Sequence, residues 1–265
     1  MIPGDCLLEV CVDGAAGLTA ALAGGADRIE LCSALALSGL TPSPGLMRLA
    51  GQLSKPAYAM IRPRPGDFCF SPAEIDVMRA DIDAARAAGL PGVVLGASRP
   101  TGELDADALA VLVPHARGLG LTLHRAFDVA PDLEAALETA IDLGFERVLT
   151  SGGETSAIAG GGRLRDLVAR AAGRISIMAG SGVTPANVQA LVEQTGVREV
   201  HGSFSRRHAP VSGPERLHAL GFALAEQAET DQASVAAAKA ALERVPKSGN
   251  RFSDQTRTRN ENLGR

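Results

Sequence analysis

The feature that most constrains the fold is a regular alternation of short strand-like runs with longer Ala- and Leu-rich helical stretches. The last strand-like run starts 192 residues after the first, so each of the seven intervening repeats takes about 27 residues. That length suits a strand, a helix and two short loops, which indicates parallel strands joined by right-handed crossovers. Strands are expected at Leu7–Val12, Arg28–Leu31, Ala57–Arg62, Gly92–Leu95, Leu121–His124, Arg147–Thr150, Ser176–Ala179 and Glu199–His201.

Helix boundary signals fall between these runs. Ser71-Pro72-Ala73-Glu74 predicts a capping box that opens a helix to about Ala88, and Thr184-Pro185 and Thr230-Asp231 predict two further N-termini. Left-handed glycines are expected to end helices at Gly144, Gly173 and Gly196. Eight such units favour a closed (β/α)8 TIM barrel of the α/β class over an open doubly wound sheet.

Length and composition fit one large domain. The 265 residues are close to the roughly 250 typical of these barrels, and 46% of them are hydrophobic. We expect the barrel to span residues 1–245, with an irregular stretch at Gly202–Glu229 before a last helix that ends near Val245. Residues 246–265 carry only Phe252 and Leu263 as apolar side chains, which predicts a disordered polar tail.

Several functional classes are disfavoured by charge and motif content. The net charge of −4, with 3% aromatic residues, argues against nucleic-acid binding. No apolar run reaches the length of a membrane span, and no secretory signal is evident. Four cysteines in a long chain do not make a disulfide scaffold, so a cytoplasmic protein is expected. Neither G-x-G-x-x-G nor a Walker A motif occurs, so no nucleotide cofactor is expected.

Ionisable residues collect where the strands end, which in a barrel is the face that carries the chemistry. Glu-x-Cys closes the first two strands, and period-two alternation puts both side chains of each pair on one face. We interpret the converging polar groups as a candidate acid–base constellation: Glu9, Glu30, Arg62, His124, Asp128 and His201. Arg64 and Arg125 alternate out of phase with Arg62 and His124, and we expect them to form structural ion pairs.

The last two strand exits carry a second signal. Glycine-rich turns there can offer backbone N–H groups to a phosphate, which predicts an anion site at Gly180, Gly182, Gly202 and Ser203. The alternative is that Gly180 and Gly182 only permit a tight turn.

Cys11 and Cys32 suggest a different chemistry, because soft thiolate ligands select Cu(I) or zinc. Met60 or Met178 could add a thioether. The alternative is that both cysteines are small buried hydrophobes. Cys6 lies at the wrong end of its strand for such a site. No strong metal-binding motif occurs.

Lysine is scarce, with only Lys55, Lys239 and Lys247 in the chain. Lys55 precedes the third strand, and the other two follow the eighth. Because a Schiff-base enzyme needs an inward lysine near a strand exit, that reaction class is excluded.

The same residues resemble the copper homeostasis protein CutC family. The matching blocks are LEVC, GGADRIELC, GLTPSPG, MIRPRPGDF, HRAFD, RVLTSG, MAGSGV and EVHGS, in family order from Leu8 to Ser203. The resemblance implies a TIM barrel, a cytoplasmic location, a role in copper tolerance and a homodimer or larger homo-oligomer. This chain departs from the family pattern at Phe70, at Leu123, in the GASRPTGELD loop and after His201, and its Cys69 has no expected family counterpart.

Two hypotheses follow. In the first, which the resemblance supplies, the protein handles copper and binds Cu(I) through Cys11 and Cys32, with or without a histidine as a further ligand. In the second, it is an enzyme that acts on a small phosphorylated or carboxylated metabolite. Glu9 or Glu30 would then be the base, His124 or Asp128 its partner, and Arg62 the clamp on developing charge.

Overall fold

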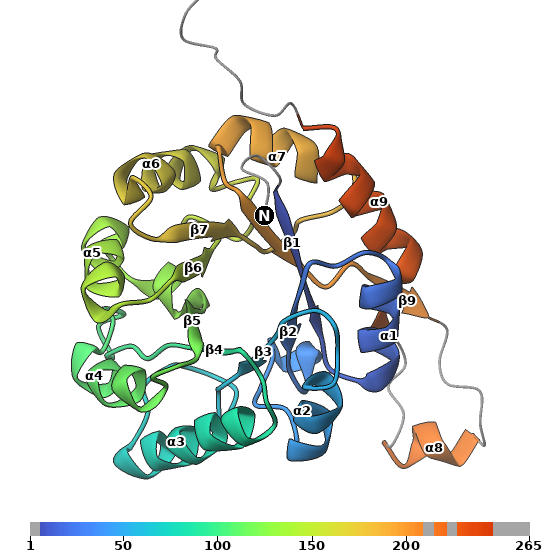
Figure 1. The fold of residues 1–265 in the computed structure, drawn as a ribbon, viewed down its shortest axis with the longest axis horizontal. Helices are drawn as coiled ribbons and strands as arrows, with labels where there is room; N and C mark the ends of the chain where they lie inside the picture. Colours follow the sequence, from blue (N-terminus) through green and yellow to red (C-terminus); the bar gives the residue numbers. More distant parts are fainter. Residues whose placement is uncertain (1–5, 209–214, 222–226, 246–265) are drawn as a thin grey trace, which may run out of the picture.

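Eight parallel strands close into a barrel in which β8 pairs with β1, as the sequence predicts (Figure 1). The computed structural model describes residues 6–208, 215–221 and 227–245. The barrel strands are β1 Leu7–Val12, β2 Arg28–Leu31, β3 Ala57–Met60, β4 Gly92–Leu95, β5 Gly120–Leu123, β6 Arg147–Thr150, β7 Ser176–Ala179 and β8 Glu199–Gly202. The predicted tail, 246–265, lies outside the described residues.

Helices surround this ring of strands (Figure 1). They are α1 Ala15–Ala23, α2 Pro44–Ala50, α3 Pro72–Ala87, α4 Ala106–His115, α5 Leu133–Leu143, α6 Gly161–Ala171, α7 Val188–Thr195 and α9 Gln232–Glu243, with short 3-10 turns η1 Leu35–Leu37 and η2 Arg125–Val129. The short helix α8 Glu215–Ala219 lies apart from this ring in Figure 1. The predicted capping box is confirmed, since the Ser71 hydroxyl accepts from the Glu74 amide and the Glu74 carboxylate accepts from the Ser71 amide. Left-handed Gly144 and Gly196 end α5 and α7 as expected.

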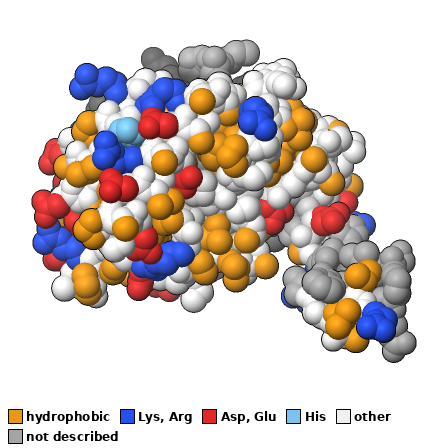
Figure 2. All heavy atoms as spheres, turned by 90° about the horizontal axis from the view of Figure 1, so that it is seen from below, with side chains coloured by type: hydrophobic (Ala, Val, Ile, Leu, Met, Phe, Trp, Pro, Cys, Tyr) orange, Lys and Arg blue, Asp and Glu red, His pale blue; other side chains and the backbone are white. Residues whose placement is uncertain are grey.

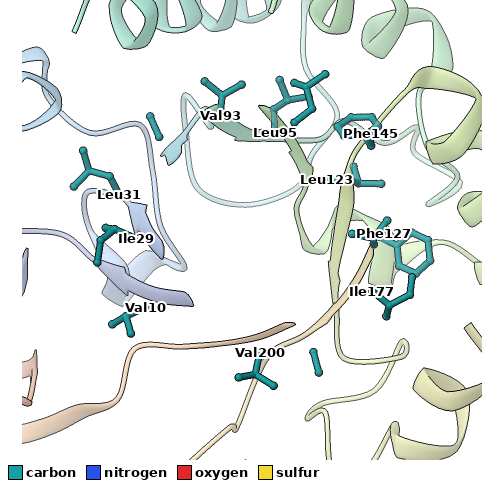
Figure 3. Close-up of a cluster of buried hydrophobic side chains, with 14 of the residues drawn as sticks. Val10, Ile29, Leu31, Val93, Leu95, Leu123, Phe127, Phe145, Ile177 and Val200 are labelled. Atoms are coloured by element: carbon teal, nitrogen blue, oxygen red, sulfur yellow. The ribbon is translucent and has the colours of Figure 1, made fainter. Parts of the chain in front are cut away.

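The hydrophobic core lies between the strands and the helices. Outward-facing strand residues such as Val10, Ile29 and Leu123 are fully buried against the helical layer, and Phe127 and Ile177 join the same cluster (Figure 3). The alternate residues of each strand therefore face the barrel interior, where several of the side chains are charged or polar.

The N-terminal half of the interior is filled by a charged group of side chains, Arg28, Tyr58, Arg147 and Glu199, which we call the barrel plug. Glu199 accepts hydrogen bonds from Arg28 at 2.5 Å and from Arg147 at 3.2 Å. Both guanidinium groups also lie over the Tyr58 ring, 5.5 and 5.0 Å from its centroid. Branched aliphatic residues usually fill this position in such barrels, so the ion pairs take the place of apolar packing.

Two glycines make room for the plug. A Cβ atom on Gly92 would lie 2.4 Å from the Tyr58 ring, and one on Gly120 would lie 2.2 Å from its hydroxyl oxygen. Any side chain at either position would displace the tyrosine. Because β4 and β5 carry glycine at these positions, the Tyr58 ring can close the N-terminal end of the barrel interior.

Three predicted boundaries are wrong. The helix expected at Thr184-Pro185 begins at Val188, because the Asn187 side chain accepts the Thr184 N–H and holds residues 184–187 as a turn. The stretch expected to be irregular contains two antiparallel strands, β9 Ser205–His208 and β10 Gln227–Thr230, as well as α8. The third and fifth strands end one or two residues early, so Arg62 and His124 stand just beyond β3 and β5.

The molecular surface mixes acidic and basic side chains with small apolar areas in the view of Figure 2. In the part of the chain that the structure describes, no helix is both long and apolar enough to cross a membrane. Lys239 pairs with Asp27, immediately before β2 and thus at the N-terminal end of the barrel, 2.6 Å away. This position agrees with the exclusion of a Schiff-base lysine.

Candidate functional site

A cavity of about 1370 Å³ opens at the C-terminal end of the barrel. Its wall is made by loops that follow the strands, and part of it by β9 and β10. The candidate residues Cys11, Glu30, Arg62, His124 and His201 all line it. The structure thus brings together side chains that are up to 190 residues apart in the chain.

His201 lies between two carboxylates at the bottom of this cavity. Its Nδ1 atom is 2.9 Å from Glu9 Oε1, and its Nε2 atom is 3.7 Å from Glu30 Oε2. Strand pairing explains both contacts, because Glu9 is the register partner of His201 and Glu30 is the register partner of Cys11. Arg28 forms an ion pair with Glu9 from below.

The two carboxylates have opposite electrostatic environments. Burial raises the pKa of Glu9, but the Arg28 and His201 charges outweigh burial and bring it down to about 2. Burial raises the pKa of Glu30. The His201 charge lowers this pKa, but by less, so the pKa stays above its ordinary value. Burial would lower the pKa of His201, but Glu30 and Cys11 raise it well above its ordinary value. The site therefore holds a fixed carboxylate, an imidazolium and a carboxyl group with a raised proton affinity.

Cys11, Glu30 and His201 form what we call the floor cluster. One ligand atom from each lies within 4.8 Å of the others, and all three side chains are buried. Cys32 stands to one side of this cluster, where its thiol donates to Glu30 Oε2 at 3.5 Å. Burial, with the Glu30 charge adding to it, raises the pKa of the Cys32 thiol well above its ordinary value. Cys11 is thus better placed than Cys32 to act as a thiolate.

The two methionines considered as thioether ligands lie in different layers of the barrel interior. Met60 packs with Cys32 in a small interior apolar cluster. Met178 accepts a hydrogen bond from Arg28 at 3.2 Å, which places it in the plug below the floor cluster. Cys6 and Cys69 are partly buried free thiols, and neither lines the cavity.

His124 is a buried, neutral histidine. Burial and, second, the Arg62 charge lower its pKa to about 3. Its Nδ1 accepts the Ala126 N–H at 3.1 Å, so the ring proton is on Nε2. That Nε2 has no hydrogen-bond partner among the described residues, and the Phe68 ring packs 4.8 Å away.

Arg62 holds two loops at the mouth of the barrel. Its terminal nitrogens donate to the carbonyl oxygens of Leu37 and Gly39 on one side and of Gly66 on the other. Its Nε–H has no hydrogen-bond acceptor in the described part of the chain. Arg62 is therefore a positioned positive charge rather than a free clamp. Arg64 turns away to Asp67 and Glu74, which is the structural ion pair the sequence predicts.

Asp128 organises the loop after β6 and does not contact the floor cluster. Its carboxylate accepts from the Thr150 hydroxyl at 2.5 Å and from the Ser151 and Gly153 amides, and it pairs with Arg125. Because these contacts hold the loop together, the Asp128 carboxylate has a structural role. The structure does not place it next to Glu9 or Glu30 as the partner of a catalytic base.

The glycine-rich turns after β7 and β8 meet beside His201. A Cβ on Gly180 would lie 3.4 Å from His201 Cβ, and one on Gly202 would lie 3.5 Å from the Val183 carbonyl oxygen. Gly182, Gly202 and Ser203 line the cavity, whereas Gly180 lies behind them against Leu149 and His201. The four predicted anion-site residues are thus adjacent in space.

Ser205, Arg207 and residues 228–230 also line the cavity, and the sequence does not predict this. The charged plug is missed as well. Arg28 alternates with Glu30 and Cys32, and this period-two spacing is the signal that could have placed its side chain inside the barrel.

A closed parallel barrel with helices around it and a buried Cys, Glu and His cluster at its C-terminal mouth defines a TIM-barrel protein whose cavity carries polar, ionisable side chains. The chain belongs to the CutC family, whose sequence model matches residues 6–206. A CutC family protein of Caulobacter vibrioides is 59% identical over 239 residues, which cover 89% of this chain and 96% of that one. The corresponding protein of Sinorhizobium medicae is 56% identical over 237 residues, with the same coverage.

Solved structures agree with this assignment. A crystal structure from Streptococcus agalactiae, described as a copper homeostasis protein CutC, superposes with a TM-score of 0.72 at 35% identity and covers 75% of this chain and 98% of its own. The thiamine phosphate pyrophosphorylase of Pyrococcus furiosus superposes with a TM-score of 0.57 at 16% identity, covering 92% and 99% of the two chains. The second likeness concerns the fold alone.

Proposed function

We propose that the cavity binds Cu(I) through Cys11 and His201, and that the protein serves copper homeostasis in this way. The observation that carries the proposal is the convergence of Cys11, Glu30 and His201 within 4.8 Å at the cavity floor. Thiolate and imidazole are ligands that Cu(I) accepts, whereas a carboxylate is a harder ligand that would balance charge. The name of the Streptococcus agalactiae relative supports the choice of copper.

Cys11 is the first thiol ligand in this proposal, and Cys32 is a second thiol next to it. The Cys32 thiol donates a hydrogen bond to Glu30, and its raised pKa means that it loses its proton less readily than an ordinary cysteine. Metal binding has to remove a proton from His201, whose pKa is raised well above its ordinary value. Copper affinity should therefore rise with pH, with protons released on binding.

The test is an anaerobic competition for Cu(I) against a coloured chelator such as bicinchoninate. Wild type should bind one Cu(I). Cys11→Ser should weaken binding by more than the roughly 10- to 100-fold typical of losing an outer partner of a metal ligand. Cys32→Ser should have a smaller effect, and Cys69→Ser, a partly buried thiol outside the cavity, is the matched control. A Cys11→Ser, Cys32→Ser double variant that binds as wild type would refute the thiolate site.

A second function is favoured by the Glu9–His201–Glu30 arrangement. Two carboxylates with pKa values shifted in opposite directions, on either side of one imidazole, are typical of acid–base sites. In this proposal Glu9 orients His201, and Glu30 exchanges a proton with a small phosphorylated or carboxylated metabolite. The chemistry would then use the cavity without a resident metal.

This second function is tested on protein stripped of metal by a chelator. Metabolites that raise the melting temperature are incubated in D2O, and deuterium incorporation next to a carbonyl is followed by NMR. Glu30→Gln should abolish the exchange while ligand binding persists. Exchange at the wild-type rate in that variant would remove Glu30 from the role.

Cellular location and assembly are part of the same proposal. A thiol site for Cu(I) needs a reducing compartment, and the four cysteines are free thiols. This supports a cytoplasmic protein. Family resemblance supports a homodimer or larger homo-oligomer, which light scattering after size exclusion would test directly.

A further inference from the structure

We propose that the turns after β7 and β8 bind the phosphate group of a small phosphate monoester. The binding groups are the backbone N–H groups of Gly182, Val183, Ser203 and Phe204, which we call the amide corner. This inference deepens the second proposed function. It rests on that function for the reaction, whereas binding of the phosphate is measurable without turnover.

The amide corner consists of hydrogen-bond donors without protein acceptors. None of the four N–H groups donates to another described residue, although all four residues line the cavity. Neighbouring groups of the same turns are paired: the Gly180 N–H donates to Thr150 O and the Thr184 N–H to Asn187 Oδ1. Val183 and Phe204 are only 7% and 5% exposed. Since buried backbone donors are nearly always paired, the Val183 and Phe204 amides call for an acceptor in the cavity, and the more exposed Gly182 and Ser203 amides precede them directly in the chain.

Backbone conformation in the two turns is unusual and is held by contacts. Phe204 has φ +45°, and Ser181 and Gly182 follow one another at +77° and +71°. A left-handed aromatic residue is strained, and such strain is typical of positions where the backbone must present its amides to a ligand. The Ser181 hydroxyl, which donates to Thr155 O at 2.9 Å, and the Asn187 amide, which donates to Gly182 O, fix the first turn.

Unpartnered buried side chains across the cavity point independently to a ligand. His124 Nε2–H and Arg62 Nε–H are donors without acceptors among the described residues, and the two side chains are 3% and 5% exposed. Glu30 Oε1 is a buried acceptor without a donor. A phosphate monoester that also carries carbonyl and hydroxyl groups matches this set of two donors and one acceptor.

Phe68 packs against two members of that second group, and all of them line the same cavity as the amide corner. Its ring centroid lies 4.8 Å from that of the His124 ring and 5.0 Å from the Arg62 guanidinium. The ligand class that fits both groups is a phosphate monoester of a small hydroxy-carbonyl compound.

Charges around the rim set the strength of binding to a free anion. Glu154 and Glu229 line the cavity with exposed carboxylates, and Arg125 and Arg207 line it with cationic groups. Because the charges oppose one another, long-range attraction is weak. Affinity has to come from the directed amide hydrogen bonds, so inorganic phosphate should bind saturably and chloride at matched ionic strength should not.

The test uses metal-free full-length protein labelled with nitrogen-15. Inorganic phosphate and glycerol phosphate should shift the amide resonances of Gly182, Val183, Ser203 and Phe204 along saturable curves, with glycerol and chloride as inert controls. Ser203→Glu places a carboxylate in the corner and should weaken phosphate binding by at least tenfold. Ser54→Glu, exposed before β3 at the opposite end of the barrel, adds the same charge and should bind as wild type.

Gly182→Asp provides a second variant if Ser203→Glu fails to fold, since Asp tolerates left-handed backbone better than most residues. Unshifted amides, or wild-type binding by a folded Ser203→Glu protein, would overturn the proposal. Cys11→Ser should keep phosphate binding while it loses copper binding. Loss of phosphate binding in that variant would mean that the anion binds at the floor cluster, and would overturn its assignment to the amide corner.

Discussion

The interior of the barrel has two polar layers that differ in how completely their groups are paired. In the plug, Glu199 receives hydrogen bonds from Arg28, Arg147 and the Ser176 hydroxyl. In the layer above it, Glu30 Oε1, Arg62 Nε and His124 Nε2 have no partner in the described residues. Burial is similar in the two layers, so polarity alone does not identify the site. Pairing distinguishes the two layers, and the unpaired groups that line the cavity are the ones available to a ligand.

The largest effect is expected from breaking the paired layer. Arg28→Met leaves Glu9 and Glu199 as buried carboxylates without their main counter-charge, and should destabilise the protein by about 3–5 kcal/mol. Urea unfolding followed by circular dichroism measures this change. Arg170→Met removes an exposed arginine that pairs with Glu134 and Glu138, and as the control should cost about 1 kcal/mol or less. Equal losses in the two variants would contradict the proposed role of the plug.

An intermediate effect concerns pH. The folded pKa of His124 is lowered to about 3, so between pH 6.5 and about 3 the unfolded chain binds a proton that the folded protein does not. This difference removes about 1.4 kcal/mol of stability per pH unit as the pH falls through that window. His124→Gln should make the stability less sensitive to pH there, as unfolding curves at several pH values would show. His218→Gln, which alters an exposed histidine, should keep the wild-type dependence.

The smallest change in stability is expected in the unpaired layer. Glu30→Gln removes a buried carboxylate. The cost of burying its charge exceeds the stabilisation of that charge by its neighbours, as its raised pKa indicates. The free energy of unfolding should change by about 1 kcal/mol or less, while Cu(I) affinity falls. A destabilisation as large as that of Arg28→Met would mean that Glu30 belongs to the scaffold. The measurement pairs urea unfolding with the chelator competition.

Periodicity was sufficient to predict the barrel, since eight runs spaced by about 27 residues leave few alternatives. It also predicted that Glu9, Glu30 and His201 end their strands together. It could not predict that Cys11 pairs with Glu30, because the register of parallel strands is set by the shear of the closed barrel and not by local sequence.

Other misses have local physical causes. Arg28 and Glu199 open their strands and look like exposed edge charges, so the plug is hidden in the sequence. Thr184-Pro185 has the composition of a helix start, but Asn187 offers the Thr184 amide a competing acceptor and delays the helix. The ion pairs of Arg64 and Arg125 were predictable, because each arginine alternates out of phase with Arg62 or His124 and has a carboxylate three residues further along the chain.

The Tyr58 ring closes the N-terminal end of the barrel interior, and this gives the two proposed ligands a common route. Among the described residues, the floor cluster and the amide corner line the same cavity at the C-terminal end of the barrel. An ion and a phosphate ester would therefore share this route, and a bound ester would slow the release of the ion without changing any ligand of the ion.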